Sequence, residues 1–320
     1  MISIEINGIQ YTDWHQAQVL STLAALADSF SITGRNRFTD YQIKAGDECK
    51  VYIADELQIT GYIDTIKAGL DGMITLMGRD KTGDLVDSQL PGQTTFNQLT
   101  PIDIITKICD QFDIDVVADL ETMATIELFV VAQDETAGEA IGRMASDYAL
   151  IINSTPEGAL NIQNGTDLPF HGNSFIEGDS ITSATVIAND RRRFSEFTAI
   201  GQRYALPQVS GSVAGTSNRT RVRRKIIDGG IDSATCGFSA IRLSQWEEGQ
   251  SVRVVMDPVG LWLLPAGILI NITSPALGIN GQMAIEQALT KFTGGDATTQ
   301  FTLVSPEAYG GDPITCEWLK

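Results

Sequence analysis

The side chains that most often perform chemistry offer only weak arrangements in this sequence. Acidic pairs such as Asp84 with Asp87 and Glu247 with Glu248 could act together as the two carboxylates of a glycosidase. Nothing beside them in the sequence would raise the pKa of one carboxyl above that of its partner. We therefore interpret both pairs as solvated surface acids.

Other catalytic and cofactor-binding signals are also weak. His15 and His171 are the only histidines, which excludes a multi-histidine metal site and argues against a histidine-based triad. The four cysteines are far apart and have no histidine nearby, which predicts reduced filler residues and not a zinc site or a disulfide framework. No glycine-rich phosphate loop occurs, and no serine stands in a typical nucleophile motif. We expect no cofactor, no metal and no enzyme activity.

Basic side chains are concentrated in one segment. Nine of the 22 lysines and arginines lie between residues 191 and 225: Arg191, Arg192, Arg193, Arg203, Arg219, Arg221, Arg223, Arg224 and Lys225. They could neutralise nucleic-acid phosphates, contact the acidic surface of a neighbouring subunit, or lie on a solvated loop. We favour the subunit contact, because a chain with a net charge of −18 would repel a polyanion elsewhere.

The composition is that of a folded protein with buried cores. Of the 320 residues, 43% are apolar and 19% are charged, which is enough for two or three domains. The net charge disfavours sequence-independent binding to nucleic acid or to an anionic membrane. No apolar run approaches the roughly 20 residues of a membrane span, and the N-terminus shows no signal-peptide pattern. We expect no membrane-spanning segment, and synthesis and assembly in a cytoplasm.

The sequence pattern of residues 1–94 predicts short strands. Ile2, Ile4 and Ile6 alternate with polar residues, and Asn7-Gly8 supplies the positive φ angles of a tight hairpin. Further alternating runs follow between turns rich in glycine and aspartate. Short strands separated by such turns predict a β-barrel or a β-sandwich.

Residues 95–170 predict a small α+β domain inserted between β domains. Thr100, Pro101 and Asp103 are typical of a helix N-terminus, and apolar residues then recur at helical spacing. Residues 136–148 fit the pattern of an amphipathic helix more fully. Two short strands flank a turn at residues 155–158.

Residues 171–320 return to a strand pattern. Strands are predicted near residues 181–187, 197–204, 252–256, 268–272, 283–292 and 301–304. Residues 233–246 predict a helix, although Gly237 weakens it, and residues 209–218 predict a mobile polar loop. The predicted fold is mainly β with an α+β insert, and part of the last segment could complete the first β domain.

Three segments together are similar to a known family. They are Gly61–Asp64 followed by Gly78–Asp87, then Asn189–Phe197, and finally Leu261–Gly267 with Leu303–Tyr309. In this order and spacing they resemble the Mu-like phage baseplate hub proteins, the family of the 43 kDa tail protein and of late control protein D. Gly78-Arg79-Asp80-Lys81-Thr82 is the most specific of these matches.

The resemblance implies a non-enzymatic structural protein of a contractile phage or prophage tail. Each subunit would supply two tail-tube-like β-barrels, so that a homotrimer forms a ring of six barrels between the sixfold tail tube protein and the threefold central spike protein. Other baseplate proteins would surround it in the virion tail baseplate, after assembly in the host cytoplasm. DNA would leave through the channel without specific binding, because three copies carry 3 × −18 = −54 charges. Since the sequence ends soon after Tyr309, spike attachment through a long extra tail is not expected.

Two groups of residues are candidates for the subunit interface: Arg79, Asp80 and Lys81, and Arg191, Arg192, Arg193, Arg221, Arg223 and Arg224. The first group also has a purely architectural interpretation, in which Arg79, Asp80, Lys81 and Asp84 form a local ion-pair network over a turn. Two alternative functions remain. One is the hub of a tail-derived secretion or injection machine, and the other is a tail-associated cell-wall hydrolase that uses an acid such as Asp134 or Glu139.

Overall fold

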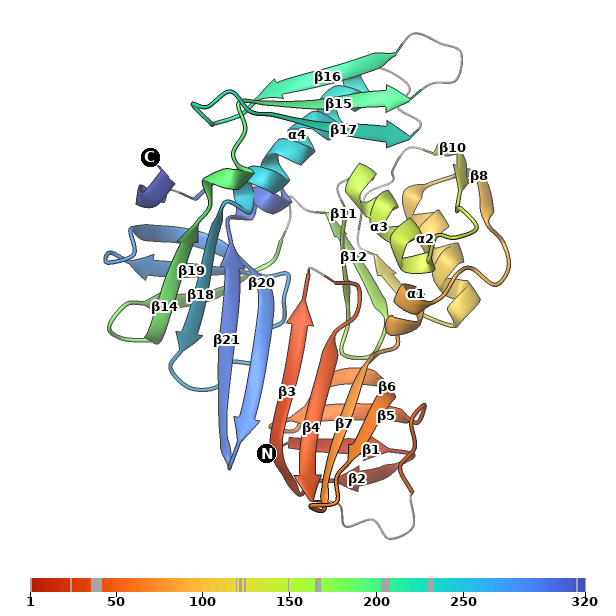
Figure 1. The fold of residues 1–320 in the computed structure, drawn as a ribbon, viewed down its shortest axis with the longest axis vertical. Helices are drawn as coiled ribbons and strands as arrows, with labels where there is room; N and C mark the ends of the chain where they lie inside the picture. The colour runs from red at the N-terminus through yellow and green to blue at the C-terminus, as the bar shows by residue number, and fades with distance from the viewer. Residues whose placement is uncertain are drawn as a thin grey trace. The chain divides into compact units, whose positions relative to one another are not determined.

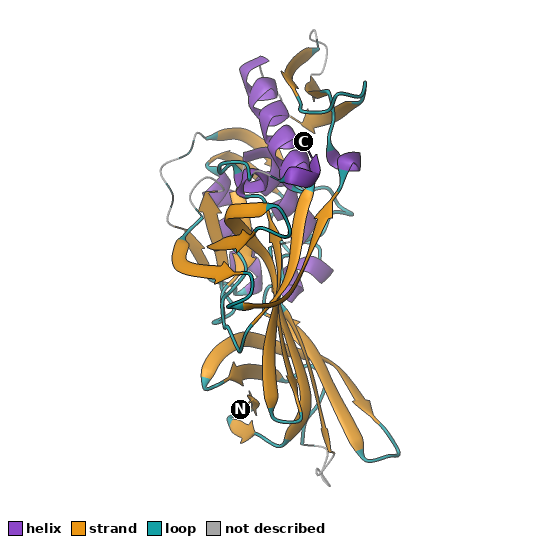
Figure 2. Cartoon of the chain, turned by 90° about the vertical axis from the view of Figure 1, so that its left-hand side faces the viewer, coloured by secondary structure: helices purple, strands orange, loops and turns teal. Residues whose placement is uncertain are grey.

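The computed structural model describes most of the chain in two compact units. The described residues are 2–23, 25–35, 42–118, 120, 123, 125–148, 150–164, 168–202, 208–228, 233–314 and 316–319, so Arg203 lies outside them. Unit 1 comprises Met1–Gln163, Pro258–Gly267 and Glu286–Gln300; unit 2 comprises Asn164–Asp257, Ile268–Ile285 and Phe301–Lys320. Strands predominate (Figure 2), which confirms the prediction of a mainly β protein with some α structure.

Unit 1 is built on an antiparallel sheet of N-terminal strands (Figure 1). The strands are β1 (Ile2–Ile6), β2 (Ile9–Tyr11), β3 (Trp14–Thr22), β4 (Ser29–Arg35), β5 (Glu48–Ile53), β6 (Glu56–Ala68) and β7 (Met73–Asp80). They follow the order β3-β4-β7-β6-β5-β1-β2, and residues 287–293 of β20 (Ile279–Thr293) add a further antiparallel strand beside β3. The predicted hairpin between β1 and β2 is present, with Asn7 at φ 51° and Gly8 at φ 77°.

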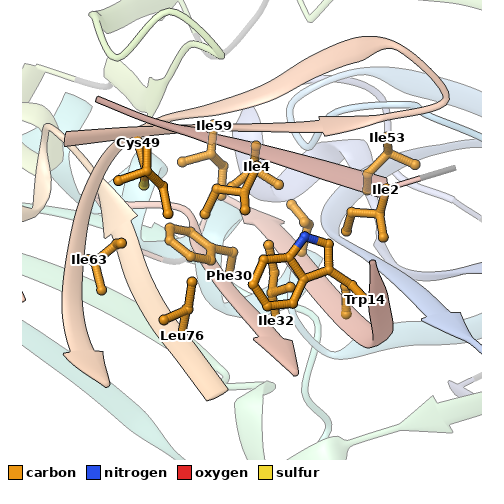
Figure 3. Close-up of a cluster of buried hydrophobic side chains, with 14 of the residues drawn as sticks. Ile2, Ile4, Trp14, Phe30, Ile32, Cys49, Ile53, Ile59, Ile63 and Leu76 are labelled. Carbon is orange, nitrogen blue, oxygen red and sulfur yellow. The ribbon is translucent and has the colours of Figure 1, made fainter. Parts of the chain in front are cut away.

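Alternating apolar side chains of this sheet form one core. Ile4, Ile32, Ile63 and Leu76 come from four different strands, and all are fully buried. Figure 3 shows the side chains of Ile4 and Phe30 pointing into the same cluster. Burial of each such side chain stabilises the fold by about 1.5–3 kcal/mol. The sheet therefore curves around its own apolar face.

A smaller α+β part of unit 1 follows β7. Its elements are α1 (Gly83–Asp87), β8 (Thr95–Leu99), α2 (Pro101–Cys109), η1 (Asp110–Phe112), β9 (Val116–Ala118), β10 (Ile126–Val130), α3 (Ala137–Tyr148), β11 (Leu150–Ser154) and β12 (Leu160–Asn164). β8 pairs with β10, and β11-β12-β9 form a second small sheet. The predicted start of α2 is confirmed as a capping box, because the Thr100 hydroxyl accepts from the Asp103 amide and the Asp103 carboxylate accepts from the Thr100 amide.

Unit 2 contains a second β structure. Its elements are β13 (Phe170–Ile176), β14 (Ile181–Ala188), η3 (Asp190–Arg192), β15 (Glu196–Gln202), β16 (Val209–Ala214), β17 (Val222–Asp228), α4 (Ser233–Gly249), β18 (Val252–Pro258), β19 (Leu269–Ser274), the first part of β20, the end of β21 (Asp296–Val304), η4 (Pro306–Tyr309) and η5 (Glu317–Leu319). The main sheet has the order β14-β18-β21-β20-β19-β13, and β16-β15-β17 form a separate sheet against which α4 packs.

The helix predicted over residues 233–246 is confirmed as α4. The mobile loop predicted over residues 209–218 is wrong for its first six residues, which form β16 in antiparallel pairing with β15. Gly211 of β16 allows the close approach of α4, since a Cβ there would collide with the backbone nitrogen of Gly237. Among the described residues no pairing closes either main sheet, so the two barrels stay a prediction.

Candidate functional site

The Gly78–Asp87 segment (the Gly78 motif) connects the end of β7 to β5, β6 and α1 of unit 1 through hydrogen bonds and ion pairs. Nε of Arg79 donates to Asp64 of β6 at 2.7 Å, and Nη1 donates to Asp87 of α1 at 3.1 Å. Nζ of Lys81 lies 2.9 Å from a carboxylate oxygen of Glu48 on β5. These pairs raise the pKa values of Arg79 and Lys81 and lower that of Asp87. Two of the three candidate residues therefore have partners inside their own chain.

Asp80, the third candidate residue in this motif, is a buried hydrogen-bond acceptor and not part of an ion pair. Its Oδ2 accepts from the backbone amide of Asp28 at 2.8 Å, and its Oδ1 accepts from the amide of Thr82 at 3.1 Å. Asp28 in turn accepts from the amide of Thr22 at 2.8 Å. The side chain of Asp80 thus fixes the segments before β4 and after β7.

The prediction of a local ion-pair network in this motif is correct for two of its four residues and wrong for the other two. Arg79 and Lys81 take part as predicted, but their partners are Asp64, Asp87 and Glu48. Asp80 is buried, and Asp84 is exposed without an ion pair to a described residue. The partners Asp64 and Glu48 are distant in sequence, which explains why local spacing did not reveal them.

Burial has an electrostatic consequence for the Asp28 and Asp80 pair. Burial, and then the neighbouring charge of Asp80, raises the pKa of Asp28 from 3.8 to about 7. Burial also raises the pKa of Asp80, although hydrogen bonds from Thr82 and Asp28 counteract this. The two carboxyls therefore resist carrying two negative charges at neutral pH. No local pattern distinguishes Asp28 in the sequence, because its environment comes from elements distant in the chain.

Two glycines permit the close contact of β6 and β7 at the Gly78 motif. A Cβ at Gly61 would collide with the carbonyl oxygen of Arg79, and a Cβ at Gly78 would collide with the carbonyl oxygen of Tyr62. No side chain fits in either space. Both glycines belong to the segments that resemble the hub family, and the structure gives each an architectural reason.

The clustered basic residues of unit 2 occupy η3 and the residue after it, the segment after β16, and β17; we call this cluster the basic surface. The described members are Arg191, Arg192, Arg193, Arg219, Arg221, Arg223, Arg224 and Lys225. Arg192 of η3 and Arg223 of β17 share the carboxylate of Glu247 on α4, at 3.0 Å and 3.3 Å. Arg192 and Arg223 therefore connect separate elements of unit 2 before any partner binds.

Arg193 and Arg221 also support the local fold. Arg193 donates to the carbonyl oxygens of Thr216 and Leu319 at 3.1 Å and 2.9 Å. The guanidinium of Arg221 donates to the carbonyl oxygens of Asp190 and Arg191, and it lies 4.8 Å from the centre of the Phe194 ring. Both side chains are thus largely committed to η3 and its flanking segments.

Three arginines of the basic surface remain accessible to a partner. Arg219 is exposed and has only a surface ion pair with Asp190 at 3.2 Å. Arg191 and Arg224 are exposed, and the side chain of neither has an ionic or hydrogen-bonding partner in the described part of the chain.

The two acidic pairs considered for catalysis have different environments. Asp84 and Asp87 are exposed, as predicted. The prediction is wrong for Glu247 and Glu248, each only 8% exposed. Glu248 accepts from the amide of Thr216 at 2.7 Å, and Glu247 binds the arginines described above.

Burial, and then the charge of Glu248, raises the pKa of Glu307 on η4 to about 7.

Glu139, one of the acids considered for a hydrolase, caps a helix. Glu139 accepts from the amide of Thr136 at 2.9 Å, and the Thr136 hydroxyl accepts from the amide of Glu139 at 3.1 Å, which is a helix cap for α3. Within the described ranges, no three His, Cys, Asp or Glu side chains gather as metal ligands. No described helix has the length and apolar character needed to cross a bilayer.

Comparison with known proteins links the first half of the chain to phage baseplates. Residues 1–80 match the N-terminal domain of the GpP-like baseplate assembly proteins of phage Mu, and residues 82–164 match the second domain of gp44-like baseplate hub proteins. The baseplate hub protein gp44 of Escherichia phage Mu is 25% identical over 210 residues. That match covers 62% of this chain and 55% of gp44, so the chain matches about half the length of its curated relative.

Solved structures extend the likeness of fold to nearly the whole chain. The 43 kDa tail protein of prophage MuSo2 from Shewanella oneidensis has a TM-score of 0.85 at 24% identity, over 96% of this chain and 98% of that one. A component of the E. coli type VI secretion system, described as similar to the phage T4 tail proteins gp27 and gp5, has a TM-score of 0.60 at 13% identity, over 94% of this chain and 76% of that one.

The fold and the matched domains define a phage-type tail protein of the baseplate. The two domain matches adjoin at Lys81, inside the Gly78 motif that carried the resemblance in the sequence. The chain belongs to the Mu-like baseplate hub proteins, and the family predicted from the sequence is confirmed.

Proposed function

We propose that three copies of this chain form the ring that joins the sixfold tail tube to the threefold central spike. The observation that supports this most is the occurrence of two consecutive hub-family domains in residues 1–80 and 82–164, in a chain whose fold resembles a phage tail protein over 96% of its length. The tube protein, the spike protein and other baseplate proteins are the partners in this proposal.

The symmetry match would come from two β domains in each subunit. Unit 1 and unit 2 each contain an extended β-sheet. We assign residues 1–94 and 171–320 to two tube-like β domains, with residues 287–293 completing the first, and residues 95–170 to an α+β domain at the periphery. Three chains then present six β domains to the tube and threefold symmetry to the spike.

The acidic charge would serve the passage of DNA. Three chains carry 3 × −18 = −54 charges. Acidic residues that face the channel would repel the phosphate backbone and prevent DNA from binding during exit. A channel surface that is neutral or basic would contradict this part of the proposal.

A tail-derived secretion or injection machine is a second candidate, supported by the likeness of fold to a type VI secretion component. Purification of particles that contain this chain distinguishes the two. DNA-filled heads attached to the tails support the phage hub, whereas tail-like particles without heads support the injection machine.

Electron microscopy of the purified oligomer tests the proposed ring directly. We expect threefold class averages with six similar β domains around an open channel. Averages without a channel, or with β domains in unequal positions around it, would contradict the proposal. Mixing the oligomer with spike and tube proteins should give a complex with the spike on one face and the tube on the other.

A further inference from the structure

β17 forms an open edge of the three-stranded sheet in unit 2. It pairs in parallel with β15, which lies between β17 and β16 (Figure 1). No strand of the described chain pairs with the other edge of β17. Along a parallel pair, alternate residues direct their N–H and C=O groups away from the paired neighbour. These groups can accept a further strand.

The side chains of β17 combine apolar and basic character. Ile227 is buried with Cys236 and Ala240 of α4. The two-residue period of a strand therefore places Val222, Arg224 and Ile226 on the opposite face of the sheet. Val222 and Ile226 are 44% and 66% exposed, and Arg224 between them is exposed as well. Exposed aliphatic side chains beside a guanidinium are suited to a protein partner with apolar and acidic groups.

Charge excludes the simplest partner, which is β17 of another copy. Pairing of two β17 edges would set Arg223, Arg224 and Lys225 against the same residues, and like charges on adjacent strands are destabilising. The rest of the chain is strongly acidic, because the whole has 40 acids against 22 basic residues. A different surface of a second copy therefore supplies the complementary charge. A contact between two different surfaces of identical chains is heterologous, and such contacts can close into rings.

We propose that the open edge of β17 takes up an acidic, extended segment of a second copy of this chain, so that strand addition joins successive subunits. The inference rests on the proposed ring and specifies one contact within it. Backbone hydrogen bonds would provide the geometry of the contact, and Arg224 would select an acidic strand.

Two charge-reversal variants separate the contribution of the β17 edge to self-association from that of the rest of the basic surface. Arg224→Glu changes an exposed arginine on β17 that has no ionic partner in the described part of the chain. Arg219→Glu makes the same change of charge on the basic surface but outside the strand. We expect Arg224→Glu to weaken self-association about tenfold, and Arg219→Glu to weaken it no more than about twofold. Analytical ultracentrifugation of the full-length variants measures both, and circular dichroism checks that they fold.

Hydrogen exchange of residues 222–228 tests strand addition separately from side-chain contact. We expect about half of these amides to exchange more slowly in the wild-type oligomer than in dilute monomer, and the same amides to lose that protection in Arg224→Glu. An oligomer without this protection, or equal weakening by the two variants, would overturn the β17 contact and leave the proposed ring standing. A wild-type chain that never self-associates would contradict both.

Discussion

Replacement of Asp28 by asparagine should change the pH dependence of stability in unit 1. The pKa of Asp28 is raised to about 7 by burial and by Asp80. The nearby basic residues Arg79 and Lys81 pair with other acids and give this carboxyl no counter-charge. The folded state therefore keeps a proton on Asp28 up to about pH 7, whereas the unfolded chain releases it near pH 4.

The sign and size of the effect follow from this difference. Between pH 4 and pH 7 the folded state binds more protons at Asp28 than the unfolded state does, so this group lowers stability as the pH rises. A shift from 3.8 to about 7 corresponds to about 4 kcal/mol when complete. An asparagine side chain at this position cannot ionise, and its oxygen can still accept from the amide of Thr22. We expect Asp28→Asn to increase stability by about 1 kcal/mol or less at pH 4.5 and by about 2–4 kcal/mol at pH 8.

Urea denaturation followed by hydrogen exchange of the β3, β4 and β7 amides measures the stability of unit 1 at each pH. Asp80→Asn is the matched control. Both carboxylate oxygens of Asp80 accept from backbone amides, so an amide group there must leave a buried donor without an acceptor. This control should lose about 1–3 kcal/mol at pH 4.5. The loss should be smaller at pH 8, because the substitution also removes the charge of Asp80 that helps to raise the pKa of Asp28. A difference between wild type and Asp28→Asn that stays constant from pH 4.5 to pH 8 would refute the reasoning.

Three further predictions concern packing and ion pairs. Gly61→Ala should destabilise unit 1 by more than about 3 kcal/mol, because its Cβ would meet the Arg79 carbonyl oxygen. The control Gly142→Ala, in the open middle of α3, should stabilise the protein by about 0.5–1 kcal/mol. Thermal melts measure both variants, and equal effects would contradict the close contact at Gly61. Arg192→Ala should lower the free energy of unfolding of unit 2 by about 1–3 kcal/mol, because it leaves Glu247 with one cation fewer. The control Arg191→Ala should lower it by less than about 0.5 kcal/mol in the same urea titrations. The reverse order would contradict the pairing of Arg192 with Glu247. Arg191→Glu should weaken subunit assembly without lowering the melting temperature, and unchanged sedimentation would remove Arg191 from the interface.

Local sequence predicted those elements whose stabilising contacts are themselves local. Asn7-Gly8 determines its hairpin through its own backbone angles, and Thr100 with Asp103 caps α2 across three residues. Strand β16 was missed because its small polar residues have little intrinsic preference for a strand. It exists through pairing with β15 and through the close approach of Gly211 to α4.

In the candidate sites, too, local sequence did not reveal contacts between residues that are distant in the chain. Arg79 and Lys81 were recognised, but their partners Asp64 and Glu48 are brought near by strand pairing, which local spacing does not encode. Glu247 and Glu248 were assigned to the surface because nothing beside them in the sequence would raise the pKa of one carboxyl above that of the other. In the structure both are buried: arginines of η3 and β17 pair with Glu247, and the amide of Thr216 donates to Glu248. The cluster of arginines was visible in the sequence, whereas its division into internal and accessible members required the fold.

The mass of the assembled protein tests the central claim most directly. Light scattering of the full-length chain, alone and with the spike protein, reports mass without reference to shape. The account predicts a species of three 34.6 kDa chains, about 104 kDa for the hub itself, whose mass stays constant at concentrations above the dissociation constant of the oligomer. A chain that remains at 34.6 kDa under both conditions, or that assembles in multiples other than three, would contradict it.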